Sequence, residues 1–369
     1  TNPDPEGLTE ATDLLMKSQN PLLIVGDRVS DDDGMDAAVE LAELTGMPVY
    51  QSRGAEVSFP TTHPQYLGIH SLRVSENREA LRQHDLILTV GMDTFDELFY
   101  WGDVILDNST KLIHIDPIPG RVGKTEPTDI GIISNCKTAL EAINQTLKGS
   151  TESYENKERK DHSVELASLK RKGYEDSVSD RWKNTPMSPA RMMYELSESV
   201  PDNSIIVDDS VSNRAAVRHY FQGKVRDDIR GVRGQSIGGG IGATMGTKCA
   251  FPERPVFGII GDGSAMRTIQ GLWTAANDNI PCVFVICNNG MYRVLKVNFN
   301  IYQTELLEET EPAGENLLYS NFDTPFDISE IAKGMGLHAE RVTDPLEISG
   351  AVKRALSSGG PSLIDIVID

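Results

Sequence analysis

Short apolar runs alternate with helical patterns along the first 150 residues. The apolar runs have the length of buried strands, and the segments between them space their apolar residues as an amphipathic helix does. This alternation predicts a parallel sheet with helices on both faces. The expected strands are residues 21–26, 48–51, 85–91, 111–116 and 130–134, the expected helices are 35–45, 76–83 and 138–147, and residues 52–68 are expected as a long loop.

The same alternation returns in residues 188–369, after a polar and charged stretch at 151–187. That stretch predicts a linker followed by a helix that crosses the surface. We therefore expect an α/β protein with two doubly wound parallel-sheet domains, residues 1–150 and 188–369. The expected strands of the second domain are 204–208, 256–260, 282–287, 337–342 and 361–368, with helices from 188, at 326–335 and at 345–356 and an irregular acidic segment at 303–324.

Polar residues follow two strands of the second domain directly. Gly261-Asp262-Gly263-Ser264 comes after the strand at 256–260, and Asn288-Asn289-Gly290 ends the strand at 282–287. Between them, a helix starting near Ala265 is expected to place Ile269, Leu272, Trp273 and Ala276 on one face. Ligands of open parallel sheets bind at the carboxyl ends of the strands.

The residue types at these strand ends favour a metal and a diphosphate. Asp262 supplies a carboxylate oxygen and Asn289 an amide oxygen, which are hard ligands of the kind that Mg2+ takes together with phosphate oxygens. Gly261 and Gly263 allow the backbone to approach a ligand, and the N–H groups at the start of a helix attract anions.

Two other segments have alternative interpretations. At the end of the strand at 204–208, the polar residues up to Asn213 could cap the following helix or hold a diphosphate. The glycine-rich run 231–246 fits both GxGxxG and GxSxG, the latter making Ser236 the nucleophile of a serine hydrolase. Both motifs need a preceding strand, and residues 230–234 are too polar and glycine-rich for one.

GDG at Gly261-Asp262-Gly263, with residues 264–287 before NN at Asn288-Asn289, resembles the thiamine diphosphate signature of the 2-oxo acid decarboxylase and acetolactate synthase superfamily. This resemblance implies a lyase that uses thiamine diphosphate and Mg2+ for the non-oxidative decarboxylation, or carboligation, of a 2-oxo acid. It implies Asp262, Asn289 and the backbone carbonyl of Met291 as metal ligands. The implied cofactor-binding residues are Ser212, Asn213, Gly261, Asp262, Gly263, Ser264, Asn289 and Met291.

The resemblance also gives the glycine-rich run a third interpretation. Ile237 would be the aliphatic wedge that bends the cofactor into a V shape, and the Gln235 backbone carbonyl would accept from its 4′-amino group. Segments of the first half, such as FPTTHPQYLG, resemble the middle domain of the same superfamily. In acetolactate synthases that domain holds FAD, and in many decarboxylases it is empty; FAD is possible here, but no motif supports it.

The chain departs from the family pattern in several places. The N-terminal pyrimidine-binding domain and its catalytic Glu are expected to be absent, so the chain alone should be incomplete; it begins at Thr1 rather than Met. Among benzoylformate decarboxylases, which it resembles most, a catalytic His stands where this chain has Leu98. An aromatic substrate contact maps to Asn298, and Arg293 replaces a small residue. The substrate is therefore expected to differ from benzoylformate.

Composition narrows the classes of partner. With 55 acidic and 35 basic residues, the formal net charge of -20 argues against nucleic acid and anionic membranes. The four cysteines lack zinc spacing and are expected as reduced thiols in a cytoplasmic protein. The resemblance implies a homodimer or homotetramer with the site at a subunit interface. An acetolactate synthase-like carboligase with FAD, a serine hydrolase using Ser236 and a non-catalytic thiamine diphosphate-binding module remain the alternatives.

Overall fold

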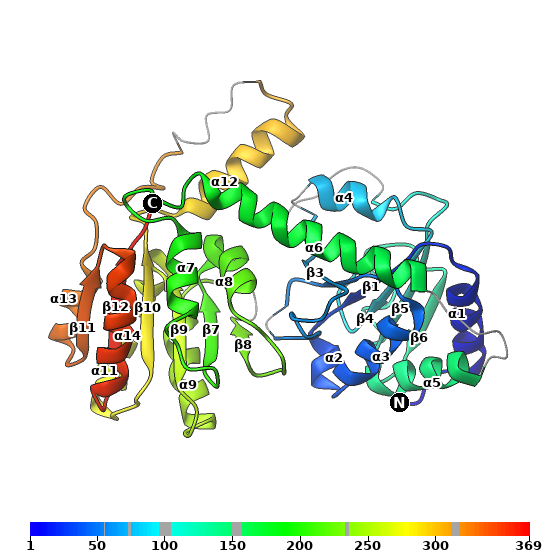
Figure 1. Cartoon of the computed structure of the whole chain (residues 1–369), viewed down its shortest axis with the longest axis horizontal. Helices are drawn as coiled ribbons and strands as arrows, with labels where there is room; N and C mark the ends of the chain where they lie inside the picture. Colours follow the sequence, from blue (N-terminus) through cyan, green and yellow to red (C-terminus); the bar gives the residue numbers. More distant parts are fainter. Residues whose placement is uncertain (55, 73–74, 96–104, 150–156, 233–235, 311–316) are drawn as a thin grey trace. The chain divides into compact units, whose positions relative to one another are not determined.

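The computed structural model describes residues 1–369 except 55, 73–74, 96–104, 150–156, 233–235 and 311–316 (Figure 1). The chain forms two compact units. Unit 1 comprises residues 1–174 and 223–226, and unit 2 comprises residues 175–222 and 227–369. In the described part of each unit, the strands form one six-stranded sheet in which every pair is parallel. The expected α/β class with two doubly wound parallel sheets is confirmed.

The sheet of unit 1 has the strand order β3-β2-β1-β4-β5-β6. Both of its faces are buried, because alternate residues of a strand point to opposite faces. Leu23 and Val25 pack in one apolar cluster with α1, α3 and α5, whereas Leu22 and Ile24 pack in another with α6. The strands are β1 (Pro21–Val25), β2 (Val49–Gln51), β3 (Tyr66–Ile69), β4 (Leu86–Val90), β5 (Lys111–Asp116) and β6 (Ile130–Ile133), and the helices are α1 (Pro5–Lys17), α2 (Asp27–Asp31), α3 (Met35–Thr45), α4 (Ser75–Leu81), α5 (Cys136–Gly149) and α6 (Lys157–Ser179).

The sheet of unit 2 has the order β11-β12-β10-β9-β7-β8. Residues of α9, α11 and α13 share one apolar cluster with the strands, while α7 and α14 pack against each other. The strands are β7 (Ile205–Asp209), β8 (Ile229–Gly231), β9 (Val256–Gly261), β10 (Val283–Asn288), β11 (His338–Val342) and β12 (Ser362–Val367). The helices are α7 (Pro189–Ser197), α8 (Arg214–Tyr220), α9 (Gly240–Ala250), α10 (Asp262–Ala265), α11 (Gly271–Asn277), α12 (Arg293–Ile301), α13 (Ile328–Gly334) and α14 (Ile348–Ser357), with short turns at Val211–Asn213, Tyr302–Leu306 and Pro345–Glu347.

Two short strands lie where the sequence predicted none. β3 overlaps the end of the expected loop 52–68, where the Gln65 side chain donates to the carbonyls of Ala42 and Met47 at 2.8 Å and fixes the loop against α3. β8 overlaps the stretch that was judged too polar for a strand. It lies at the edge of the sheet and pairs only with β7, and Ile229 is its one buried residue. One apolar side chain is enough at such an edge.

The prediction of a helix from Ala265 onward is also wrong. The chain forms the single turn α10, leaves the helix after Ala265 and resumes as α11 at Gly271. Thr268, in the break, donates its hydroxyl to the carbonyl of Gly238 at 2.7 Å. Leu272 is fully buried as expected, but the Trp273 side chain is 57% exposed. The break rotates α11, so Trp273 does not lie on the apolar face.

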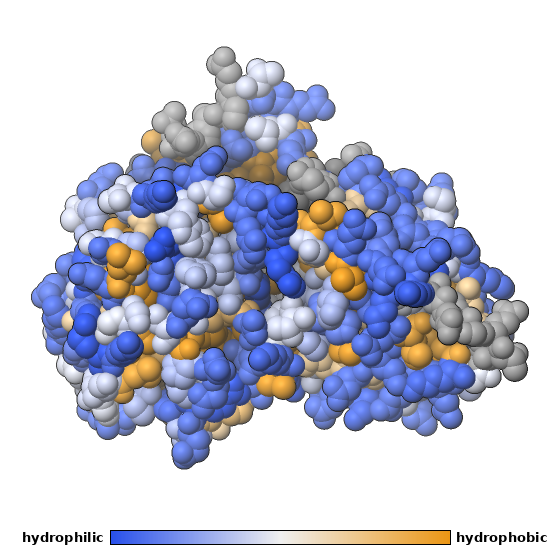
Figure 2. Space-filling view, in the orientation of Figure 1, coloured by the Kyte–Doolittle hydropathy of each residue, from blue (hydrophilic) through white to orange (hydrophobic). Residues whose placement is uncertain are grey.

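The surface is mainly hydrophilic on the face that Figure 2 shows, and apolar residues occur there in small scattered groups. None of the helices in the described ranges combines the length and the apolar character that crossing a membrane requires.

The contact between α9 and β9 gives a test of the packing in unit 2. A Cβ added at Gly258 would lie 2.1 Å from the Thr244 hydroxyl oxygen, so Gly258→Ala should lower the free energy of unfolding by about 1–3 kcal/mol. Adding Thr244→Ala should restore part of this loss. Gly246→Ala, where a Cβ meets no atom within 4 Å, is the control and should be neutral or stabilising. Urea denaturation of the variants measures these differences, and equal stability of Gly258→Ala and wild type would contradict the packing.

Candidate functional site

The carboxyl ends of β9 and β10, two neighbouring central strands of the second sheet, lie side by side. The strands are parallel neighbours in the middle of the sheet, and Cys287 of β10 is in register with Gly261 of β9 (Figure 1). Asp262 follows β9 directly and Asn289 follows β10. The two residues that the sequence predicted to meet are therefore neighbours.

Three backbone N–H groups hold the Asp262 carboxylate. Gly263 donates to Oδ1 at 2.6 Å, and Asn289 and Gly290 donate to Oδ2 at 3.0 and 2.7 Å. A carboxylate offers about four lone-pair positions, so Oδ1 retains one for a further partner. The residue is only 3% exposed, and its orientation is fixed by backbone from both strand ends.

The buried carboxylate of Asp262 has no counterion among the described residues. Within the described ranges, no Lys, Arg or His forms an ion pair with it. Burial raises the pKa of its carboxyl, against the three N–H donors that lower it, and the nearby carboxylate of Asp365 raises it further. An unpaired buried charge is costly. A divalent cation would supply the missing positive charge, so the residues present fit Mg2+.

The remaining predicted metal ligands lie on the turn after β10. Asn289 is partly exposed, and its Oδ1 accepts from the Met291 N–H at 3.1 Å. Gly290 has φ +65°, which a glycine adopts without strain. Across the part of the chain that the structure describes, His, Cys, Asp and Glu form no cluster of three or more that could hold a metal ion. A metal here would depend on Asp262 together with neutral oxygen atoms and ligand or water oxygens.

Close packing explains one glycine of the GDG turn. A Cβ at Gly263 would lie 2.4 Å from the ring of Tyr292, whereas a Cβ at Gly261 would make only ordinary contacts. Tyr292 immediately precedes α12, in which Arg293 lies 3.5 Å from a carboxylate oxygen of Asp369. α12 also carries Asn298, so two of the three residues that depart from the family pattern, Arg293 and Asn298, lie on it.

Asp209, which the sequence did not single out, connects the glycine-rich segment to the GDG turn. Its Oδ2 accepts from the backbone N–H of Gly238 at 3.2 Å and of Gly240 at 2.9 Å, and also from the Ser264 hydroxyl. The Ser264 oxygen in turn accepts from the Gly238 N–H at 2.8 Å. Burial raises the pKa of Asp209, which is 3% exposed. The signal that could have revealed it is its position as the last residue of a buried strand.

The predicted phosphate-binding residues after β7 have different environments. Ser212 is exposed in the short turn before α8. Asn213 is 3% exposed, and burial raises the pKa of the nearby Cys287 thiol while the Asn213 side chain opposes this rise. Asp208 accepts from the Ser210 N–H and hydroxyl at 3.0 and 2.6 Å. Ser212 is thus the predicted residue whose hydroxyl faces solvent.

The glycine-rich segment is described only in part. Ile237 is partly buried, while Gln235 lies outside the described residues. Gly238 has φ +101°, and a Cβ there would approach Arg267 to 2.7 Å. Ser236 is exposed, and no His, Asp or Glu among the described residues is hydrogen-bonded to its side chain. The arrangement that activates a serine nucleophile is not seen there.

At the carboxyl ends of the strands in unit 1, described side chains pair with one another. Gly26 packs so closely that a Cβ would lie 2.5 Å from the carbonyl of Gly91. Arg28 pairs with Asp93 at 2.8 Å and with the buried Asp116 at 2.7 Å. These contacts lie at the carboxyl ends of the strands, the edge at which ligands of open parallel sheets bind. Leu98 lies outside the described residues.

Comparison with known proteins identifies both halves of the chain. Residues 8–143 match the family model "Thiamine pyrophosphate enzyme, central domain", and residues 215–366 match "Thiamine pyrophosphate enzyme, C-terminal TPP binding domain". Benzoylformate decarboxylase of Pseudomonas aeruginosa is 29% identical over 367 residues, which are 99% of this chain and 64% of that protein. Acetolactate synthase 1 of Zea mays is 28% identical over 377 residues, which are 99% of this chain and 56% of that protein.

A solved structure gives the same result. The thiamine diphosphate-dependent 4-hydroxybenzoylformate decarboxylase of Rhodococcus jostii RHA1 superposes with a TM-score of 0.81 at 26% identity, over 99% of this chain and 64% of that one. The chain thus spans less than two thirds of the length of these relatives. With both family models matched in order and relatives aligned over almost its whole length, the chain belongs to the thiamine pyrophosphate enzymes, whose central and C-terminal domains it contains.

Proposed function

We propose that this protein takes part in the Mg2+- and thiamine diphosphate-dependent, non-oxidative decarboxylation or carboligation of a 2-oxo acid. The observation that carries the proposal is the Asp262 carboxylate, which is buried, oriented by the backbone of two strand ends and left without a cationic partner among the described residues. A magnesium diphosphate provides the charge that this position lacks.

In this proposal, different residues at the strand ends bind different parts of the cofactor. Asp262, Asn289 and the backbone carbonyl of Met291 hold Mg2+, and Ser212, Asn213, Gly261, Gly263 and Ser264 surround the diphosphate. Ile237 and the Gln235 carbonyl contact the rest of the molecule. When bound, thiamine diphosphate supplies a carbon nucleophile and accepts the electron pair that remains when the substrate loses CO2.

This chain contributes a fixed position for the metal ligand Asp262 and low solvent access around it. Asp262 stays at one place because backbone N–H groups hold it, so metal binding requires little rearrangement. Asp209 ties Ser264 to the glycine-rich segment, which keeps Gly238 and Ile237 close to the GDG turn. Low solvent access strengthens the attraction between the fixed carboxylate and a bound cation.

The substrate and the assembly belong to the proposal as well. The similarity to benzoylformate decarboxylase and to acetolactate synthase supports a 2-oxo acid, and Asn298 and Arg293 on α12 favour one other than benzoylformate. We propose a homodimer or homotetramer that is completed by a pyrimidine-binding domain. CO2 release and acetolactate formation from pyruvate distinguish decarboxylation from carboligation, and flavin absorbance tests for FAD.

Removing the carboxylate tests the metal site directly. Asp262→Ala should abolish Mg2+-dependent binding of thiamine diphosphate in calorimetry, because the charged ligand of the cation is lost. Asp278→Ala, on the exposed end of α11, is the matched control and should bind as wild type does. Wild-type affinity in Asp262→Ala would contradict the assignment.

The pH dependence of metal binding follows from the raised pKa of Asp262. A protonated carboxyl does not bind a metal, so affinity should fall as the pH is lowered through this pKa, beginning above the ordinary value of about 3.9 for aspartate. Mn2+ titrations followed by water proton relaxation, without cofactor, exclude the titration of phosphate. Subtracting the weak binding that remains in Asp262→Ala isolates the site. If the difference in Mn2+ binding between wild type and Asp262→Ala does not change with pH down to the ordinary aspartate range, the assignment is contradicted.

Substituting two serines that are predicted to bind the cofactor should separate an effect on stability from an effect on cofactor binding. Ser264→Ala removes a donor to Asp209 and an acceptor of Gly238 N–H, both buried, and should cost about 1–3 kcal/mol of unfolding free energy. Ser212→Ala, at an exposed position, should change stability by less than about 0.5 kcal/mol and yet weaken cofactor binding. Thermal unfolding with and without the Mg2+ cofactor measures both, and equal stability losses would be evidence against these roles.

A further inference from the structure

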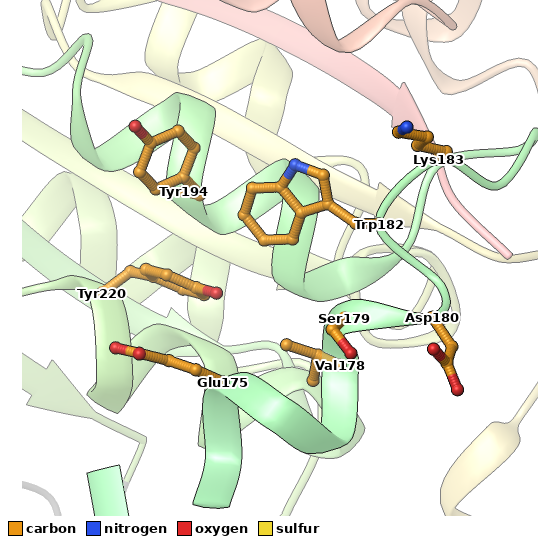
Figure 3. A pocket seen from close by; sticks show the side chains of 8 residues that line it. All are labelled: Glu175, Val178, Ser179, Asp180, Trp182, Lys183, Tyr194 and Tyr220. Atoms are coloured by element: carbon orange, nitrogen blue, oxygen red, sulfur yellow. The ribbon is translucent and has the colours of Figure 1, made fainter. Parts of the chain in front are cut away.

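Unit 2 contains a cavity that shares no residue with the predicted cofactor site. Its volume is about 610 Å³, within the range of small-molecule sites. The end of α6, the turn that follows it, α7 and α8 form its walls (Figure 3). Most of the lining is apolar and comes from three aromatic rings, Trp182, Tyr194 and Tyr220.

The three rings form inclined walls. Trp182 and Tyr194 have ring centroids 5.3 Å apart at an interplanar angle of 58°, and Tyr194 and Tyr220 are 5.9 Å apart at 73°. Rings inclined in this way do not cover one another as stacked rings would. The His219 ring also lies against Tyr220, with centroids 4.7 Å apart at 80°. Part of the π-surface of the three cavity rings therefore remains available to a ligand between them.

The charges that line the cavity are mainly negative. Glu175 and Asp180 contribute carboxylates and Lys183 contributes one ammonium group. Figure 3 shows Glu175 beside Tyr220 at one end, while Asp180 and Lys183 lie toward the other end, beyond Trp182. Burial raises the pKa of Tyr220, and the carboxylate of Glu175 raises it further. Glu175 Oε1 also lies 3.6 Å from Nε2 of His219, which does not line the cavity.

One ring of the cavity already contacts a cation of the protein. The guanidinium of Arg191, which does not line the cavity, lies 5.1 Å from the centroid of the Trp182 ring. Arg191 is also paired with Glu195 at 2.6 Å. The pairing with Glu195 offsets the positive charge that Arg191 places near this ring.

We propose that this cavity binds a small organic cation with an alkylated ammonium group. Faces of Trp and Tyr attract such cations, which are large and weakly hydrated and so lose little when they leave water. Glu175 supplies the opposite charge. A metal ion would find few oxygen ligands among the rings, and an anion would meet two carboxylates. This inference stands independently of the proposed enzymatic function.

Choline and its neutral isostere 3,3-dimethylbutan-1-ol test the proposal, because they share a shape and differ in charge. Binding is followed by tryptophan fluorescence and by ligand NMR. Choline should bind about 2- to 30-fold more tightly, the range that a cation–π contact gives. Trp182→Leu should abolish saturable binding, whereas Trp273→Leu, at an exposed tryptophan outside the cavity, should preserve it.

A second pair of variants isolates the charge. Glu175→Gln, on an exposed side chain, should weaken choline several-fold and leave the isostere unchanged, while Asp176→Asn, the neighbouring acid that does not line the cavity, should change neither. Equal affinity for the two ligands, unchanged binding in Trp182→Leu, or no saturable binding of choline up to about 10 mM would each overturn the proposal.

Discussion

A buried carboxylate held by backbone from two strand ends is the constraint on which the site in unit 2 depends. Asp262 accepts from Gly263 on its own turn and from Asn289 and Gly290 across the sheet. This geometry exists only because β9 and β10 are adjacent, parallel and in register at their ends. Without a cationic partner in the described part of the molecule, the carboxylate favours a bound cation on electrostatic grounds alone.

Asp209 extends this arrangement to the neighbouring strand. Its carboxylate accepts hydrogen bonds from the backbone N–H groups of Gly238 and Gly240 and from the Ser264 hydroxyl. The glycine-rich segment and the GDG turn therefore meet on one side chain at the end of β7. Because Gly240 has its ideal Cβ position 2.7 Å from the Asp209 side chain, a larger residue there would disturb this contact.

The two units use similar sheets in different ways. In unit 2 the carboxyl ends of the central strands present polar groups with binding capacity left. In unit 1 the corresponding edge contains Arg28 paired with Asp93 and Asp116, and Gly26 packed against Gly91. Paired charges of opposite sign need no further counterion, whereas the buried Asp262 carboxylate does. Architecture alone therefore does not determine the chemistry at the strand ends.

The sequence by itself determined most strands and most helices, because burial on both faces requires apolar runs and helices require a regular apolar period. It also determined the meeting of Asp262 and Asn289, since parallel order follows from the alternation. Tertiary structure decided the rest. The short strands β3 and β8, the break before α11 and the exposure of Trp273 depend on contacts with distant residues, as does the role of Asp209. The aromatic cavity brings together residues from 175 to 220 that have no common period or motif, so only folding makes them neighbours.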